Sequence, residues 1–397
     1  MKRRSIVALP GDGIGRVVLP EALRVLLAAG FDAEVVPAEI GWECWRRDGE
    51  PLPARTVDLL AEHRLGLLGA ITSKPPADAQ AELPDALRAR GLTYTSPILS
   101  LRRMFDQDIC IRPCRSWPGN PTNFVRRNAD GSIEEPPIDI AVFRQNTEGL
   151  YTGVEWRDPP SAVRRALAEH PLYAPFRDVV GPDLAISVRI VTRRACRRIL
   201  EAAFRHARKE GIEAVTLAEK PNVLRATSGL FEEVGREVQT GWPDIRLTSV
   251  NIDALLMQLA RRPEDHRVIV ASNLLGDLVS DAVAGLTGGL GFASSASLGP
   301  EVSVFEPAHG SAPRHAHLDP PLANPIAAIL AGASLAEAAG RPDAAATIRA
   351  AVGRVVAEGR VRTYDMLRLP AGPDAIAAGA ASTSAMTDAV IGALGRA

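Results

Sequence analysis

The sequence predicts an α/β fold in which a doubly wound, mostly parallel sheet carries helices on both faces. The first observation is that short apolar runs alternate with segments of helical periodicity along almost the whole chain. The second is size, because 397 residues with 46% hydrophobic side chains are enough for a large core in two packed lobes or one large unit. No repeat or low-complexity linker interrupts this pattern.

The predicted strands follow this alternation in order. A buried strand over 5–9 is followed by a glycine-rich turn at 11–15 and by a helix over 17–29. Further strands are predicted over 65–70, 108–112, 138–144, 185–190, 214–220, 246–252 and 268–271. Helices follow most of these strands, as a sheet wound on both faces requires.

The C-terminal part of the chain is predicted to be mainly helical. Alanine-rich helices are expected over 326–357 and 375–396, broken at 340–342 and at 370–373 by glycine and proline. Residues 155–183 are instead rich in proline, arginine and charge. We expect this segment to form a surface excursion between strands.

The charge balance and the apolar segments exclude several classes of protein. The 46 basic and 47 acidic residues are interspersed, so the formal charge of −1 offers no footprint for nucleic acid or a membrane surface. The apolar run that begins at Ile6 stops at Pro10, too short for a signal peptide, and no apolar span is long enough to cross a bilayer. The four cysteines lack paired spacings, so we expect buried, reduced thiols in a cytoplasmic protein.

The sequence GDGIG at 11–15 lies where a dinucleotide-binding motif belongs, between a strand and a helix. Its glycines follow the spacing i, i+2, i+4 rather than GxGxxG. A tight structural turn is therefore favoured over a pyrophosphate cradle, because glycine at such a turn first meets a backbone requirement.

Three arginines are candidates for carboxylate binding. Arg112 and Arg144 end the apolar strands DICIR and IDIAVFR, and Arg102 precedes them. Open α/β sheets bind ligands at strand ends, and a guanidinium holds a carboxylate through two hydrogen bonds. A single arginine of this kind is more often a surface or salt-bridge residue. Three of them favour a crevice for a small di- or tricarboxylate.

Three aspartates are candidates for binding a divalent cation. Asp277 and Asp281 are four residues apart in NLLGDLVSDAV, so a helix projects both carboxylates from one face, where they repel unless a cation lies between them. Asp253 ends the strand RLTSVNID. Oxygen ligands of this type suit Mg²⁺. An acidic pair at this spacing is more often a solvated helix face, but apolar neighbours such as Leu278 make that interpretation less favourable.

Two further residues are candidates for proton transfer. Lys220 closes the strand AVTLAEK, and the pKa of a lysine held at an apolar strand end can fall toward neutrality. Tyr151, just after NTEGL, can supply the complementary acid. From spacing alone, a solubilising charge for the lysine and a packing role for the tyrosine remain open.

Taken in order, these segments resemble the β-decarboxylating dehydrogenases, which include isocitrate, 3-isopropylmalate, homoisocitrate and tartrate or D-malate dehydrogenases. The resemblance runs nearly end to end, through LPGDGIG, SLRRMFDQDICIRP, FRQNTEGLY, EKPNVL, NID, NLLGDLVSD, GGLGFASSASLG, EPAHGSAP and ANPIA. It implies a two-domain isopropylmalate-dehydrogenase-like fold. Residues 1–107 and 284–397 would form a large discontinuous domain on the cofactor side, and 108–283 a smaller dimerising domain on the catalytic and metal side.

The resemblance also implies a role for each candidate in an oxidative decarboxylation. Lys220 matches the residue that helps to remove the substrate's hydroxyl proton, and Tyr151 the acid that protonates the enol after carbon dioxide leaves. In this family the lysine and one metal-binding aspartate come from the neighbouring subunit, so Lys220 and Asp253 are expected to reach across a homodimer. The remaining matches are Arg102, Arg112 and Arg144 for the arginines that grip the malate carboxylates, and Asp253, Asp277 and Asp281 for the ligands of Mg²⁺ or Mn²⁺.

The cofactor is expected to be NADP, with NAD disfavoured. NAD-using relatives carry an acidic residue right after GSAP, whereas this chain has Arg314 and then His315, which attract a 2′-phosphate. The segment TYDMLR resembles the one by which NADP-dependent bacterial isocitrate dehydrogenases present a tyrosine and an arginine, here Tyr364 and Arg368, to that phosphate. The same motifs imply five further cofactor-binding residues, His309, Gly310, Ser311, Ala312 and Asn324.

The substituent on carbon 3 of the substrate is expected to contact the segment TSPILSLR, where isocitrate enzymes place a serine and an asparagine and isopropylmalate enzymes two leucines. Ser96 fits the first pattern, but Ile98 replaces the asparagine and pairs with Leu99 as in the second. Burying an unpaired carboxylate against Ile98 is costly, which favours an apolar or unusual substituent. Isocitrate, homoisocitrate, tartrate and D-malate remain alternatives. A non-catalytic regulatory subunit is another, although such chains usually lose the metal carboxylates or the lysine that this one keeps.

Overall fold

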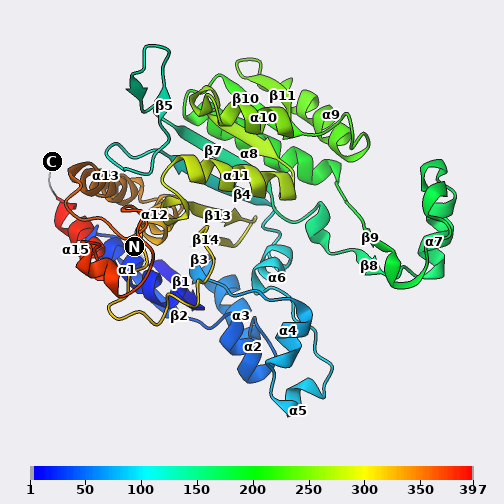
Figure 1. The fold of residues 1–397 in the computed structure, drawn as a ribbon, viewed down its shortest axis with the longest axis horizontal. Coiled ribbons are helices and arrows are strands. Elements are labelled where there is room, and N and C mark those ends of the chain that lie inside the picture. Colours follow the sequence, from blue (N-terminus) through cyan, green and yellow to red (C-terminus); the bar gives the residue numbers. More distant parts are fainter. Residues whose placement is uncertain (1–3, 396–397) are drawn as a thin grey trace.

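The computed structural model describes residues 4–395 and is built around one ten-stranded sheet (Figure 1). The strands lie in the order β11-β10-β12-β7-β4-β13-β14-β3-β1-β2. Their bounds are β1 Arg4–Gly11, β2 Ala33–Pro37, β3 Leu65–Ala70, β4 Ile109–Arg115, β7 Asp139–Gln145, β10 Ala214–Glu219, β11 Arg246–Asn251, β12 Val268–Ala271, β13 Ser294–Leu298 and β14 Ser303–Pro307. β4 is antiparallel to β7 and β13, and β13 is antiparallel to β14, whereas the other pairings within this sheet are parallel. The predicted mostly parallel sheet is confirmed.

Helices cover both faces of this sheet. Along β7, Ala141 and Phe143 pack into a core with α8, whereas Ile140 and Val142 pack into a second core with α10 and α11, because successive side chains of a strand point to opposite faces. The helix bounds are α1 Gly15–Ala28, α2 Trp42–Asp48, α3 Ala54–His63, α4 Pro76–Ala81, α5 Asp85–Arg88, α6 Pro97–Met104, α8 Arg193–Lys209, α9 Thr227–Gln239, α10 Ile252–Leu259, α11 Asn273–Leu286, α12 Ile326–Ala338, α13 Pro342–Glu358, α14 Asp374–Ala377 and α15 Thr383–Ala393.

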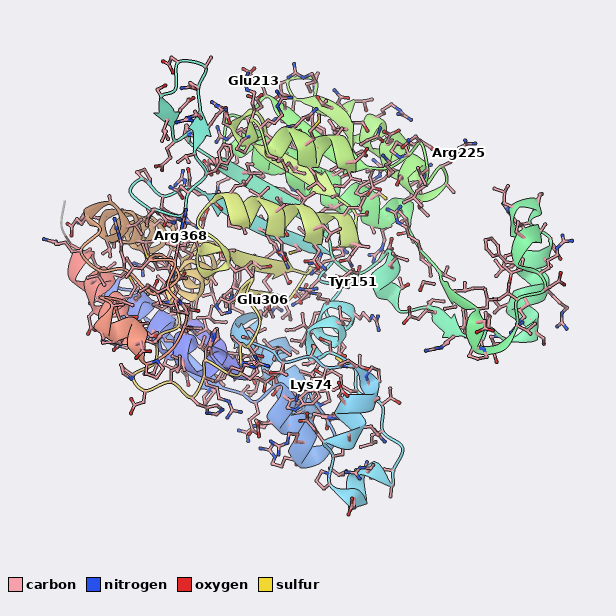
Figure 2. The ribbon with its side chains drawn as sticks, in the orientation of Figure 1. Lys74, Tyr151, Glu213, Arg225, Glu306 and Arg368 are labelled. Atoms are coloured by element: carbon pink, nitrogen blue, oxygen red, sulfur yellow. The ribbon has the colours of Figure 1, made fainter. Side chains whose placement is uncertain are left out.

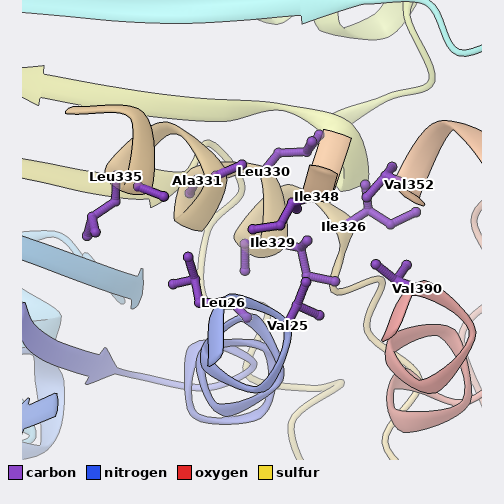
Figure 3. Packing of buried hydrophobic residues seen from close by; sticks show 14 of the residues in the cluster. Val25, Leu26, Ile326, Ile329, Leu330, Ala331, Leu335, Ile348, Val352 and Val390 are labelled. Carbon is purple, nitrogen blue, oxygen red and sulfur yellow. The ribbon is translucent and has the colours of Figure 1, made fainter. Parts of the chain in front are cut away.

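A further apolar core joins α1, α12, α13 and α15 (Figure 3). Ile329 of α12 and Leu26 of α1 are each about 1% exposed there. Alanine allows such close packing because its side chain ends at the β-carbon and loses no rotamer freedom. The predicted helices over 326–357, with their break at 340–342, are confirmed. The second alanine-rich stretch forms two helices, α14 and α15, and its predicted end at 396 lies outside the described residues.

Most predicted strands agree with the structure, but three observed strands were not predicted and one predicted strand was misplaced. The predicted ranges 65–70 and 268–271 coincide with β3 and β12. However, β2, β13 and β14 were not predicted, and β13 has the sequence SSASL, whose small side chains form no apolar run. The prediction over 185–190 is wrong for the main sheet, because β9 (Ala185–Ser187) pairs only with β8 (Glu155–Arg157).

The segment that contains β8 and β9 forms an arm that extends away from the rest of the molecule (Figure 1). It also carries α7 (Ser161–Ala168) and two short 3-10 turns, η2 (Pro171–Phe176) and η3 (Gly181–Asp183). Its Leu172 side chain is 79% exposed. The predicted surface excursion at 155–183 is therefore confirmed.

The apolar cores draw on different stretches of the chain. The cores around α1 and β1 contain residues up to Phe105 and from Phe292 onward, with Trp117 as an exception. The cores around α8 and α11 contain residues between Ile109 and Leu286. The domain boundaries at 107 and 284 stay a prediction, and residues 1–3 and 396–397 lie outside the described part.

Two predictions from composition agree with this fold. All four cysteines are buried, unpaired thiols. Between residues 4 and 395 no helix has both the length and the apolar character needed to traverse a membrane.

Candidate active site

The three candidate arginines lie within one electrostatic cluster, and each is less than 9% exposed. Arg144 of β7 forms an ion pair with Asp277, and its Nε donates a hydrogen bond to Asn273 Oδ1 at 2.9 Å. Arg112 Nη1 lies 3.1 Å from Asp277 Oδ1 and 3.0 Å from Asp281 Oδ1. The charge of Arg102 also reaches Asp277 and contributes to lowering its pKa.

Arg112 lies in the middle of β4, not at a strand end as the sequence predicts. It faces α11 because alternate residues of β4 point to that side of the sheet, and Ser280 of α11 accepts a hydrogen bond from its Nη1 at 2.7 Å. Arg144 lies one residue before the end of β7, as predicted. The arginines therefore converge from two adjacent antiparallel strands and from α6, and not from strand ends alone.

Tyr151 lies in the 3-10 turn η1 (Leu150–Thr152) beside this cluster. Its hydroxyl donates a hydrogen bond to Asp277 Oδ2 at 2.7 Å, and the centre of its ring lies 5.0 Å from the guanidinium carbon of Arg144. Burial and the neighbouring carboxylate raise the pKa of Tyr151. Figure 2 shows Tyr151 and Glu306, the carboxylate that pairs with Arg102, in the middle of the molecule between its two halves.

The pKa values of the two aspartates of α11 are shifted in opposite directions. Burial favours the neutral form of Asp277, but the charges of Arg144 and Arg112 outweigh burial and lower its pKa. Burial and the repulsion of Asp277 raise the pKa of Asp281, which Arg112 only partly offsets. Two oxygen donors on one helix face with incompletely compensated charge suit a hard divalent cation.

Lys220 and Asp253 lie elsewhere on the same sheet. Lys220 directly follows β10 and forms an ion pair with Asp253, which lies in the first turn of α10 and not at a strand end as predicted. β10 and β11 are two and three strands away from β7, or about 10 and 14 Å at the usual strand spacing. Among residues 4–395 no group of three or more His, Cys, Asp or Glu could hold a metal. Of the three predicted metal ligands, Asp277 and Asp281 therefore lie together. Asp253 of the same chain lies apart from them.

The glycines of GDGIG are required by the backbone, in agreement with the predicted tight turn. Gly13 has φ of +53°, and a β-carbon there would lie 2.1 Å from the carbonyl oxygen of Ser311. Between the glycines, Asp12 accepts hydrogen bonds from the backbone of Trp42 at 2.8 Å and of Thr72 at 2.9 Å. The turn thus packs directly against the segment 309–315 that carries the predicted cofactor residues.

The structure brings the two predicted cofactor segments together. The ring centres of His315 and Tyr364 lie 6.0 Å apart at an interplanar angle of 78°. Arg314 and Arg368 are exposed, and Arg368 donates a hydrogen bond to the carbonyl oxygen of Pro121 at 3.1 Å. A cavity of about 420 Å³ lies beside the first of these segments, lined in part by Gly13, Thr72 and Pro313.

The other predicted cofactor residues surround these segments. Ser311 shares a hydrogen bond of 2.6 Å with Thr72, and the Asn324 amide donates one of 2.9 Å to Asp365. Burial lowers the pKa of His309, so its imidazole is held neutral. Gly310 is exposed, and Ala312 adopts a positive φ of 36° in the same loop.

Helix α6 carries the residues that were predicted to contact the substituent on carbon 3. Ile98 is half-buried and packs in part against the apolar core that contains Leu101. Ile98 and Leu99 lie four and three residues before Arg102, on its side of the helix, and Ser96 precedes the helix. The contact of Ser96, Ile98 and Leu99 with the substrate stays a prediction.

Several residues that contact the cluster were missed by the sequence analysis. Arg103 of α6 donates hydrogen bonds to the carbonyl oxygens of Tyr151 and Thr152 at 2.9 and 3.0 Å. Asn273 orients Arg144, and Glu306 pairs with Arg102 at 3.4 Å. Asn273 could have been found, because it lies four residues before Asp277 and so on the same helix face.

Comparison with known proteins agrees with this arrangement. Residues 5–390 match the sequence model of the family described as isocitrate/isopropylmalate dehydrogenase. The protein DlpA of Legionella pneumophila is 36% identical over 98% of this chain, which spans 58% of that relative's length. An isocitrate/homoisocitrate dehydrogenase of Thermus thermophilus is 37% identical over 98% of each chain.

A solved structure extends the likeness to three dimensions. The crystal structure of isocitrate dehydrogenase from Methylococcus capsulatus superposes with a TM-score of 0.81 at 32% identity, covering 99% of this chain and 100% of that one. Family members act on small carboxylates with NAD(P) and a divalent metal and are generally oligomeric. The chain belongs to the isocitrate/isopropylmalate dehydrogenase family and is an NAD(P)-dependent decarboxylating dehydrogenase.

Proposed function

We propose that this enzyme catalyses the NADP-dependent oxidative decarboxylation of a 3-substituted malate to a 2-oxo acid and carbon dioxide, with Mg²⁺ or Mn²⁺. The observation that carries this proposal is the buried cluster in which Arg112 and Arg144 contact Asp277 while Tyr151 donates a hydrogen bond to the same carboxylate. Fixed guanidinium groups can bind the carboxylates of a small substrate, and a nearby phenol can protonate the enol that remains after carbon dioxide leaves.

The residues have separate tasks in this proposal. Arg102, Arg112 and Arg144 bind the substrate carboxylates and hold the carboxylate on carbon 3 in the orientation from which it leaves. Lys220 of a second subunit takes the hydroxyl proton as the carbon-2 hydride passes to NADP⁺. Tyr151 then delivers a proton to carbon 3, where the electron pair of the broken carbon–carbon bond remains. A divalent cation bound by Asp277 and Asp281 would supply Lewis-acid polarisation of the oxygen on carbon 2.

A homodimer with shared active sites completes the metal-ligand set. Asp253 of a second copy would join Asp277 and Asp281, which accounts for its separation from them within one chain. The exposed side chains of Leu274 and Leu278 lie on one face of α11, and Met257 of α10 is 56% exposed. Because α10 and α11 pack against each other, these exposed apolar side chains favour contact with another protein surface.

The preference for NADP rests on the basic character of the two cofactor segments. Arg314, His315 and Arg368 present cationic or hydrogen-bonding groups next to Tyr364, and a 2′-phosphate is bound well by such groups. NAD lacks this phosphate and gains nothing from them. The proposal is therefore NADP as the main cofactor, with NAD as the weaker alternative.

The substituent on carbon 3 is proposed to contact Ser96, Ile98 and Leu99. Ile98 and Leu99 favour an apolar or unusual substituent, since an unpaired carboxylate beside them would lose its hydration. Ser96 offers one hydroxyl, which keeps isocitrate and homoisocitrate as alternatives. A relative of 35% identity from Methanothermobacter thermautotrophicus is a 3-isopropylmalate dehydrogenase, so relatives with both kinds of substrate resemble this chain to similar degrees.

A spectrophotometric panel tests the proposal. NADP reduction is followed with Mg²⁺ and each of isocitrate, 3-isopropylmalate, homoisocitrate, tartrate and D-malate, and 2-oxo acid and carbon dioxide are measured. We expect turnover of at least one substrate, abolished by a chelator and restored by Mg²⁺. Binding of a malate without any turnover would instead favour a non-catalytic regulatory subunit.

A further inference from the structure

Glu219, the residue before Lys220, has a fully buried carboxylate. It lies outside the cluster that Arg112 and Arg144 form with the aspartates of α11. Its side chain is 0% exposed at the end of β10. One oxygen accepts a hydrogen bond from the backbone N–H of Ser272 at 2.9 Å. The other accepts hydrogen bonds from the hydroxyl of Ser228 at 2.5 Å and from Arg189 Nη2 at 2.9 Å. Three donors on one carboxylate compensate for its loss of hydration.

Arg189 joins the same junction from the chain that returns from the arm. Its guanidinium also donates to the hydroxyls of Thr227 at 3.0 Å, Ser228 at 3.1 Å and Ser272 at 2.8 Å. The ion pair therefore links four segments: the one after β9, the end of β10, the start of α9 and the start of α11. Because one guanidinium group donates hydrogen bonds to several segments, it fixes these segments relative to one another.

This junction contacts the backbone of Lys220. The backbone N–H of Lys220 points to the hydroxyl of Ser228 at 3.4 Å. The residues just beyond it are exposed, including Val223 at 65%, and Figure 2 shows Arg225 on the outside of this half. The loop after Lys220 turns back on the lysine itself, because the backbone N–H groups of Val223 and Leu224 donate to its carbonyl oxygen at 3.1 and 2.8 Å. The Glu219 junction holds the lysine main chain from its buried side, and Asp253 pairs with its amine.

We propose that Glu219 and Arg189 are positioning residues for Lys220 and therefore act in the active site of the second subunit. The inference rests on the proposed shared active site. Neither residue touches substrate. Their effect on turnover passes through the lysine backbone, whereas substrate affinity depends on the arginines of the other chain.

The single variants separate positioning from binding. Glu219→Gln keeps the volume but removes the charge that faces Arg189, and we expect kcat to fall at least tenfold while KM for the substrate changes less than about twofold. Ser228→Ala keeps the ion pair between Glu219 and Arg189 and should lower kcat about threefold. This variant tests the inference if Glu219→Gln does not fold. A kcat unchanged in folded Glu219→Gln or Ser228→Ala would overturn the inference.

A mixed dimer shows in which subunit the junction acts. Two differently tagged chains are purified together, one with Glu219→Gln and the other with Asp277→Asn. If Glu219 acts through Lys220 on the partner, one site contains only intact groups, and the mixed dimer regains about half of the wild-type kcat. If Glu219 acts through α11 of its own chain, both sites stay impaired and the inference is wrong.

The control dimer combines Lys220→Met with Asp277→Asn. It should also regain about half of the wild-type kcat, because one complete site forms. An active control with an inactive Glu219→Gln dimer overturns only the positioning role. An inactive control overturns the shared active site itself, together with the inference that rests on it.

Discussion

Tyr151 donates its phenolic hydrogen to Oδ2 of Asp277 at 2.7 Å, while Arg144 holds the other oxygen of the same carboxylate. The acid proposed to protonate the product is therefore tied directly to a proposed metal ligand. Because the carboxylate accepts from both, displacement of Asp277 would move the phenol as well. In the proposed mechanism, proton delivery by Tyr151 would therefore be coupled to metal binding by Asp277.

Replacement of Tyr151 tests proton delivery. Tyr151→Phe removes the hydroxyl but keeps the ring against Arg144, so we expect kcat to fall by about 10²-fold or more, with little change in substrate KM. Tyr173→Phe, in the arm, is the matched control and should behave like the wild type. Steady-state kinetics measures both. A Tyr151→Phe enzyme with full kcat would assign the proton to another group.

Replacement of Asp281 tests metal binding. Asp281→Asn removes one charge that faces the proposed cation and leaves Arg112 with Asp277, so the Mg²⁺ concentration for half-maximal activity should rise about tenfold or more. NADP affinity, measured by fluorescence titration, should not change. Asp58→Asn on exposed α3 is the control. An unchanged Mg²⁺ requirement in Asp281→Asn argues against this residue as a ligand.

Reversal of one charge tests cofactor choice. Arg314→Asp places an acid where a 2′-phosphate is proposed to bind, so the ratio of kcat/KM for NADP to that for NAD should fall by at least tenfold. Arg90→Asp, which changes the same charge on a distant exposed residue, should leave the ratio unaltered. A wild-type enzyme that already prefers NAD would contradict the proposed cofactor.

Asp108 predicts a dependence of stability on pH. Burial raises the pKa of Asp108 to about 6, although Arg198 Nη2 lies 2.9 Å from its carboxylate. The folded protein binds this proton more tightly than the unfolded chain, so the free energy of unfolding should fall by about 3 kcal/mol as pH rises from about 4 to about 6. Asp108→Asn should flatten that part of the profile in urea titrations. Asp244→Asn, on the surface, should retain it.

Gly13 predicts a local requirement for glycine. Gly13→Ala forces a β-carbon against the carbonyl of Ser311 at positive φ, so the free energy of unfolding should fall by about 1–3 kcal/mol. Gly392→Ala lies in α15 with open space around it and should be neutral or slightly stabilising. Thermal unfolding monitored by circular dichroism compares the two. Equal melting temperatures would refute the packing argument.

Features that depend on a few consecutive residues could be predicted from the sequence. β3 and β12 were predicted at their observed bounds, because each is a short apolar run buried on both faces. β13 was missed because SSASL contains no apolar run, and its serines are buried only through the place of the strand inside the sheet, between β4 and β14.

The sequence by itself determined that Asp277 and Asp281 share one helix face, because helical periodicity is a property of the backbone over one turn. Only the tertiary structure decided that Tyr151 and Arg144, which are 126 and 133 residues away from Asp277, meet that face. Their meeting depends on which strands pair and in which direction, and that order is set by burying apolar side chains on both faces of the sheet. No local pattern contains that information.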